Sequence, residues 1–151
     1  MSRLTLEIAL TIPDNEALTA LFTLQRLGVH VAGVVRSDLW LFEVAHDKAN
    51  ALLDALRNTE TIYNPNKHRL SVRPTDETLP GEAWVDEPGS PARHAGPPYR
   101  FAGRELPGVT ALERFVAWRL FDRDGKPAPE STVQRAVETL LCNPAFQRAI
   151  R

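Results

Sequence analysis

The sequence predicts an α+β protein whose N-terminal part is a ferredoxin-like βαββαβ sandwich. Residues 4–12 alternate between apolar and polar side chains, which is typical of a strand with one buried face. In residues 17–27 the apolar positions recur at helical spacing instead, after Asp14 as a helix N-cap and before Gly28 as a C-terminal stop. The succession of the two periodicities within residues 1–74 indicates the mixed fold class.

The next elements follow from the same two periodicities. Residues 29–35 and 39–45 are strand-like runs separated by the polar residues 36–38, and we predict a β-hairpin. Asp47 is suited to cap a second helix, and residues 68–73 resemble a last strand. The order strand, helix, strand, strand, helix, strand is the split βαβ arrangement, in which two helices cover one face of a four-stranded antiparallel sheet.

The remainder of the chain divides into an arm and a helical tail. Proline, glycine and acidic residues interrupt any periodicity in residues 75–107, which indicates a linker or an extended arm. Helical stripes in residues 109–120 and 133–141, separated by the proline break at residues 127–129, predict a C-terminal helical hairpin. The predicted parts are residues 1–74, 75–107 and 108–151.

The composition excludes several classes of partner. Apolar residues make up 43% of the 151, enough for a folded core. The net charge of −1, without a long block of either sign, argues against binding nucleic acid or an anionic membrane. Cys142 is the single cysteine, the N-terminus lacks the layout of a signal peptide, and no apolar run approaches the roughly 20 residues that cross a bilayer. We expect a cytoplasmic protein.

The residues that usually carry chemistry do not form a catalytic pattern. No two histidines have the i, i+4 spacing that directs two imidazoles to one metal ion. Asp122 to Gly125 resembles part of a calcium loop, but that alignment places Leu120 and Ser131 at the first and last ligand positions. Phosphate-binding and nucleophile motifs are missing as well. We predict no metal, no cofactor and no catalytic residues.

Candidate contact residues for a partner or ligand lie in three places. Residues 63–69 combine an aromatic ring, a rigid turn and three potential cations, which suit an anionic ligand or an acidic partner. A solvated turn before an edge strand, whose basic residues discourage edge pairing, explains the same segment equally well. The other candidates lie in the hairpin and off the main stripe of the first tail helix. The full set is Arg36, Trp40, Tyr63, Asn64, Lys67, His68, Arg69 and Trp118.

The strand predicted at residues 39–45 is apolar on both sides. Leu39 and Leu41 point to one face, and Trp40, Phe42 and Val44 point to the other. A strand of this kind requires cover on both faces, either from the C-terminal segment or from a second copy of the sheet. We therefore expect a homo-oligomer.

The N-terminal half resembles the PurS family, the small subunit of phosphoribosylformylglycinamidine synthase. Residues 24–29, Leu-Gln-Arg-Leu-Gly-Val, are similar to the Leu-Gly helix end of that family, and Val34-Val35-Arg36 is similar to its Val-Arg strand end. The resemblance implies a non-catalytic subunit that dimerises and bridges a glutaminase and an ATP-dependent synthetase in purine biosynthesis.

Two other functions compete with this interpretation. A regulatory module of the ACT type would bind an amino acid or nucleotide between paired ferredoxin-like domains, although the chain lacks a glycine-rich loop after the first strand. Single-stranded nucleic acid could stack on an open sheet face through Trp40 and Phe42, with Arg36 and Lys67 nearby. The near-neutral charge makes the nucleic-acid function the less favoured of the two.

Overall fold

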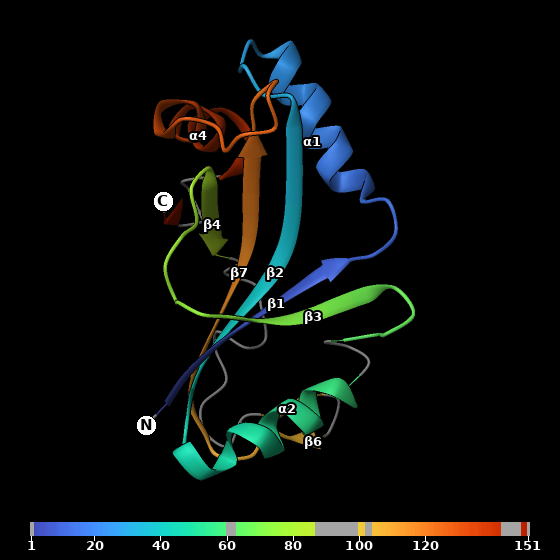
Figure 1. Ribbon diagram of the computed structural model, residues 1–151, viewed down its shortest axis with the longest axis vertical. Coiled ribbons are helices and arrows are strands. Elements are labelled where there is room, and N and C mark those ends of the chain that lie inside the picture. The colour runs from blue at the N-terminus through green and yellow to red at the C-terminus, as the bar shows by residue number, and fades with distance from the viewer. Residues whose placement is uncertain (1, 60–62, 87–99, 102–103, 143–148, 151) are drawn as a thin grey trace. The chain divides into compact units, whose positions relative to one another are not determined.

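The structure is a computed structural model that describes residues 2–59, 63–86, 100–101, 104–142 and 149–150. It is a mixed α+β protein with an antiparallel sheet, as the sequence predicts (Figure 1). The chain divides into two compact units, and each unit combines three separate stretches of sequence. Unit 1 contains residues 1–12, 38–76 and 89–114, and unit 2 contains residues 13–37, 77–88 and 115–151.

Unit 1 contains part of the sheet and helix α2. Its strands follow the order β3-β1-β2-β7, and β1 pairs with β3 in antiparallel register from Thr5 opposite Arg73 to Leu10 opposite His68. Two long strands, β2 and β7, contribute one part to each unit. The elements are β1 (Ser2–Leu10), β2 (Gly33–Val44), the short helix η1 (His46–Lys48), α2 (Ala49–Arg57), β3 (His68–Arg73), β5 (Arg100–Phe101), β6 (Arg104–Glu105) and β7 (Val109–Phe121).

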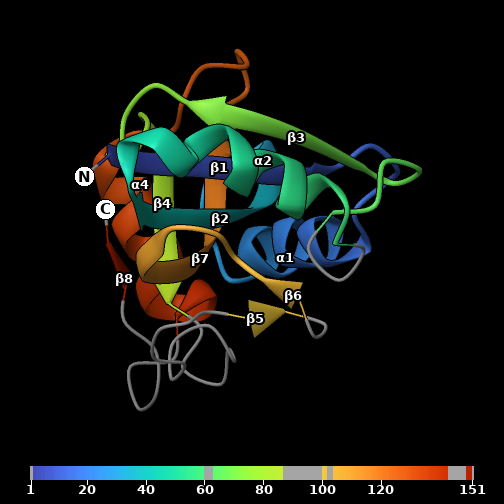
Figure 2. The same cartoon turned by 90° about the horizontal axis from the view of Figure 1, so that it is seen from below.

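The core of unit 1 lies between α2 and one face of its strands. Helix α2 lies over β1 and β2 (Figure 2). Its Leu52 and Leu56 belong to one core cluster with Leu6 of β1 and Phe42 of β2, and all four side chains are fully or almost fully buried. Trp40, Phe42 and Val44 point to this core, as the alternation of the sequence predicts. The opposite face of the same strands carries Arg3, Thr5, Leu41 and Glu43.

Unit 2 packs two helical segments against the other part of the sheet. Its strands follow the order β2-β7-β4-β8. Leu24 of α1, Leu120 of β7 and Ala136 of α4 belong to its core cluster. The elements that belong to unit 2 alone are α1 (Asn15–Arg26), β4 (Glu82–Asp86), α4 (Glu130–Ala136), the π-helical turn η2 (Val137–Leu141) and β8 (Ala149–Ile150).

The predicted β-hairpin at residues 29–45 is wrong. The structure has one strand, β2, which runs through the polar residues 36–38, so residues 2–73 contain three strands in place of four. The polar residues are tolerated because Arg36 has acidic partners on α1. Strand β7 takes the neighbouring place, since the Ala32 N–H donates to the Phe121 carbonyl at 2.8 Å and the Ala45 N–H donates to the Gly108 carbonyl at 3.0 Å.

The predicted C-terminal helical hairpin is wrong in its first half. Residues 109–121 form strand β7, although their apolar residues also match a helical stripe. Three consecutive side chains, Phe115, Val116 and Ala117, are buried, and successive residues of a strand point to opposite faces. This part of β7 is therefore covered on both faces. Its residues are apolar on both sides, so the sequence lacks the alternation of apolar and polar residues that marks a strand. The second half is helical, as predicted, in α4 and η2.

The predicted arm at residues 75–107 is wrong where it is described in detail. Strand β4 lies inside this range, and all five of its residues are buried. It pairs with β7 in antiparallel register, with Trp84 opposite Ala117. Residues 87–99 and 102–103 of the arm lie outside the described residues. The division at residues 74 and 107 is replaced by the interleaved units.

Gly81, just before β4, provides a test of this packing. It has a φ of +77°, and an added Cβ would lie 2.7 Å from the Leu120 carbonyl oxygen. We predict that Gly81→Ala lowers the free energy of unfolding by more than about 2 kcal/mol, because left-handed strain adds to a clash with backbone. Gly125 is the matched control, since its φ is +75° and no atom lies within 4 Å of the added Cβ.

The measurement is urea unfolding of both variants, followed by tryptophan fluorescence. Gly125→Ala should lose about 1 kcal/mol from strain alone. An equal loss in the two variants would contradict the close approach of Gly81 to β7.

Candidate functional site

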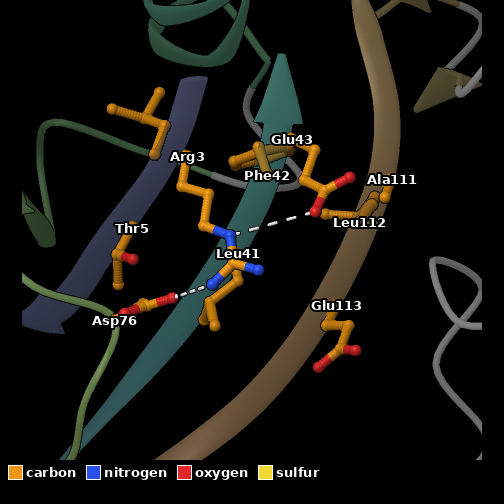
Figure 3. Close-up of a pocket in the computed structure, with 10 residues that line it drawn as sticks. Arg3, Thr5, Leu41, Phe42, Glu43, Asp76, Ala111, Leu112 and Glu113 are labelled. Atoms are coloured by element: carbon orange, nitrogen blue, oxygen red, sulfur yellow. Dashed lines mark hydrogen bonds and ion pairs between the residues drawn. The ribbon is translucent and has the colours of Figure 1, made fainter. Parts of the chain in front are cut away.

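A cavity of about 240 Å³ lies in unit 1, and we call it the Arg3 cavity. Its walls come from the face of β1, β2 and β7 that lies opposite α2, because side chains of alternate residues point to opposite faces. Asp76, which follows β3, closes one side (Figure 3). The lining residues include Arg3, Thr5, Leu41, Glu43, Asp76, Leu112 and Glu113.

The charges of the Arg3 cavity are unequal. The Arg3 guanidinium lies between two carboxylates, with Nη1 donating to Asp76 Oδ2 at 2.7 Å and Nε 3.9 Å from Glu43 Oε1 (Figure 3). Glu113 brings a third carboxylate to the lining. Because the Arg3 side chain is 71% exposed, these ion pairs are screened by water and hold it weakly. The lining thus carries one positive and three negative charges.

Thr5 adds a buried hydroxyl to the Arg3 cavity. Only 4% of this residue is exposed, and its side chain lies beside Arg3 and Asp76 (Figure 3). The hydroxyl lines the cavity and is open to it. It can donate one hydrogen bond and accept others. The cavity therefore contains a hydroxyl that can form a hydrogen bond with a ligand.

A second hollow, the α1 groove, lies in unit 2 and has a volume of about 410 Å³. Its surface is mainly apolar, with Trp118 of β7 and Leu140 of η2 facing one side of α1. The complete lining is Asn15, Glu16, Thr19, Ala20, Thr23, Trp118, Leu140 and Leu141. An apolar hollow beside a helix is suited to take a side chain of another protein.

Arg36 fixes the start of α1 beside this groove. Asp14 caps the helix, accepting hydrogen bonds from the backbone N–H groups of Glu16 and Ala17. Its second oxygen accepts a hydrogen bond from Arg36 Nε at 3.0 Å, and Arg36 Nη1 also donates to Glu16. The Arg36 guanidinium lies 6.0 Å from the ring centroid of Trp118. Arg36 therefore joins the first turn of α1 to both β2 and β7.

Helix α1 exposes two large apolar side chains to solvent. The side that faces the core buries Ala17, Ala20 and Leu24. Leu18 and Phe22, one helical turn apart, are 49% and 54% exposed. A surface helix ordinarily buries its largest apolar side chains and exposes polar ones. The outward face of α1 therefore has the composition of a contact surface.

Three of the candidates from the sequence lie outside residues 63–69. Arg36 and Trp118 lie close together, and Trp40 does not lie with them. Arg36 and Trp118 both lie at the α1 groove, although neither lies in the element predicted for it. Trp40 is 5% exposed and stacks on Phe42 in the core of unit 1, with the Arg114 guanidinium 5.2 Å from its ring centroid. As a stacking platform for a partner or for nucleic acid, Trp40 is covered.

The segment at residues 63–69 is held by its own hydrogen bonds. The Asn64 carbonyl accepts from the backbone N–H groups of Lys67 and His68, and the Asn64 N–H donates to His68 Nδ1 at 2.9 Å. Tyr63 packs against the core of unit 1. These contacts give Tyr63, Asn64 and His68 a structural role within the segment. Lys67 and Arg69 are exposed, and their role in binding stays a prediction.

The sequence did not single out the α1 surface or the Arg3 cavity. Leu18 and Phe22 were assigned to the core because they share the helical spacing of the buried residues. The excess of apolar residues around the helix was a signal, since one stripe needs fewer of them. The cavity had no such signal, because Arg3, Asp76 and Glu113 are distant in sequence and meet only in the folded unit.

Metal ligands, membrane spans and comparison with known proteins do not identify the function of these sites. In the described part of the chain, no three His, Cys, Asp or Glu side chains are grouped so that they could hold a metal ion. None of the helices described is both long and apolar enough to cross a membrane. Comparison with protein-family models, curated proteins and solved structures finds no match. The assignment of function therefore depends on the geometry.

Cys142 gives a test of local burial in unit 2. The free thiol follows η2, and burial raises its pKa above the ordinary value. We predict that iodoacetamide alkylates it more slowly in the folded than in the urea-unfolded protein near pH 8, because less thiolate is present. The difference should narrow as the pH rises through the folded pKa. A folded thiol that reacts faster than the unfolded one would contradict this environment.

Proposed function

We propose that the chain is a non-catalytic assembly subunit and that its first partner is a second copy of itself, bound through α1. The exposure of Leu18 and Phe22, on the side of α1 opposite its buried residues, is the observation that carries the proposal. A helix with this distribution gains more from burial against another molecule than from its own core.

Burial of Leu18 and Phe22 in a dimer would contribute to its stability. Full burial of a Leu or Phe side chain contributes about 1.5–3 kcal/mol, so covering the exposed half contributes about 1 kcal/mol per residue. Two such residues from each of two copies contribute about 4 kcal/mol before the cost of association. Further burial is needed for a stable dimer. The neighbouring groove, with Trp118 and Leu140, offers it.

The charges of α1 favour an antiparallel contact between two copies. Glu16 lies in the first turn and Arg26 in the last, so an antiparallel pair of α1 helices places each glutamate near the arginine of the other copy. The opposed helix dipoles add to this preference. The small side chains of Thr19 and Thr23, which line the groove, leave room for Phe22 of the second copy.

The larger assembly follows from the resemblance to the PurS family, whose members are cytoplasmic subunits beside a glutaminase and a synthetase. The helix end supports the resemblance, because α1 ends at Arg26 and Gly28 has a φ of +83°. The Val-Arg pair does not, since it lies inside β2. The order β3-β1-β2-β7 in unit 1 suggests a variant of the split βαβ arrangement, with β7 in place of the first hairpin strand.

Phe22→Asp is the direct test of the α1 contact. It places a charge on the outward face without removing a buried side chain, so we predict a monomer where the native chain forms a dimer. The measurement is molar mass by light scattering after gel filtration. Val72→Asp is the matched control, because Val72 is 51% exposed on β3 of unit 1 and should not alter the mass.

A charge exchange tests the antiparallel geometry. Arg26→Glu exchanges the positive charge of the last turn for a negative one and should weaken the dimer, because it places two glutamates opposite each other. A native chain that is monomeric at high concentration would exclude the second copy as the partner. A dimer unaffected by Phe22→Asp would move the interface away from α1.

The assembly itself is tested by affinity purification of the tagged protein from its native cells, in the presence of glutamine and ATP. We predict recovery of the glutaminase and synthetase subunits of the purine pathway, identified by mass spectrometry, and their loss with Phe22→Asp if α1 is the dimer contact they require. Recovery of neither subunit, with the dimer intact, would reject the PurS-like role and leave self-association standing.

A further inference from the structure

We infer that the Arg3 cavity binds a small organic cation, a primary amine with a short apolar chain. The proposal is independent of the assembly function, because the cavity lies in unit 1 and α1 lies in unit 2. It depends on three properties of the cavity: its charge, its Thr5 hydroxyl and its size.

The charge of the cavity selects a cation. Glu43, Asp76 and Glu113 line it with three carboxylates, and Arg3 is the basic residue of the lining. A cation that enters has a carboxylate to pair with even while Arg3 remains in place. An anion would meet a net negative lining and be repelled.

The hydrogen-bonding groups specify an organic donor. Carboxylates accept hydrogen bonds, and the Thr5 hydroxyl, which lines the cavity, accepts or donates one. An ammonium group carries three donors, which can satisfy two carboxylates and this hydroxyl together. A bare metal ion is less suited, since no metal-holding group of side chains is found among the described residues.

The size and the apolar part of the lining limit the ligand. A volume of about 240 Å³ corresponds to roughly eight water molecules at about 30 Å³ each, below the range of drug-sized pockets. Leu41 and Ala111 present apolar surface between the charged groups. These two features fit a chain of a few methylene groups that ends in an ammonium group.

The Arg3 guanidinium is itself a cation held by carboxylates of the cavity. It therefore competes with a cationic ligand for them. Its guanidinium already lies between Asp76 and Glu43, at 2.7 and 3.9 Å. Because its side chain is 71% exposed, it can turn into solvent at little cost when a ligand enters. Removal of Arg3 should therefore strengthen the binding of an amine, whereas it would abolish the binding of an anion.

The experiment is titration calorimetry at low salt with cadaverine, and with 1,5-pentanediol as the neutral molecule of the same length. We expect cadaverine to bind, pentanediol not to bind, and Arg3→Ala to tighten cadaverine binding about threefold or more. Asp76→Asn and Glu113→Gln should each weaken it about tenfold, as loss of a charge-assisted hydrogen bond does. Asp47→Asn, an exposed acid outside the cavity, should leave it unchanged.

Thr5→Val tests the hydroxyl separately and should weaken binding about threefold while the melting temperature is kept. The proposal is overturned if pentanediol binds as tightly as cadaverine, if Arg3→Ala abolishes binding in a folded protein, or if cadaverine produces no heat with the native chain. Should Arg3→Ala fail to fold, the native chain alone decides, through the loss of cadaverine binding as salt is raised.

Discussion

The ion pair between Arg36 and Asp14 fixes the position on which the α1 surface depends. Asp14 uses one carboxylate oxygen to cap α1 and the other to accept from Arg36 on β2, so the helix can begin only where this strand directs it. The pair is largely shielded, at 23% and 15% exposure, and is therefore less screened than a surface ion pair. With the first turn fixed, the alanines face the core, and Leu18 and Phe22 face outward.

The long strands β2 and β7 connect this local arrangement to the fold. Each contributes one part to unit 1 and another to unit 2, and backbone hydrogen bonds join the two strands within each unit. Every residue of such a strand has a fixed face, because a shift of one position would exchange the buried and exposed sides. Trp40 and Phe42 of β2 are buried in the core of unit 1, and Arg36 of β2 contacts the start of α1 within unit 2.

The sequence predicts the elements whose surroundings are simple. Strand β1, helices α1 and α2, strand β3 and the last helical segment follow from periodicity, because each packs one side against its own unit. The predicted cap of α2 is wrong, since Asp47 lies in η1 and α2 has no side-chain cap. The prediction fails where both faces of a strand are covered. Residues 115–117 of β7 are all buried, and the regular alternation that marks a strand is lost.

Buried polar groups caused the other failures. The polar residues 36–38 indicated a turn, yet Arg36 has acidic partners and Ser37 is 8% exposed. In β4, Glu82 is 4% exposed and indicated a solvated arm, but its carboxylate accepts hydrogen bonds from Trp84 Nε1 at 2.7 Å and the Leu79 N–H at 3.1 Å. A charged residue is predicted to be exposed because the sequence does not show the hydrogen-bond partners that allow it to be buried. The Arg3 cavity was missed for the same reason.

The exposed face of α1 is difficult to explain by folding alone. A helix of 12 residues is marginal by itself and is stabilised mainly by the apolar side that it packs. Here that side combines Leu24, which is fully buried, with Ala17 and Ala20, which bury little area, while Leu18 and Phe22 stay about half exposed to water. Covering the outward face would add buried apolar area that the helix does not gain inside its own unit, which is the physical basis for proposing a partner there.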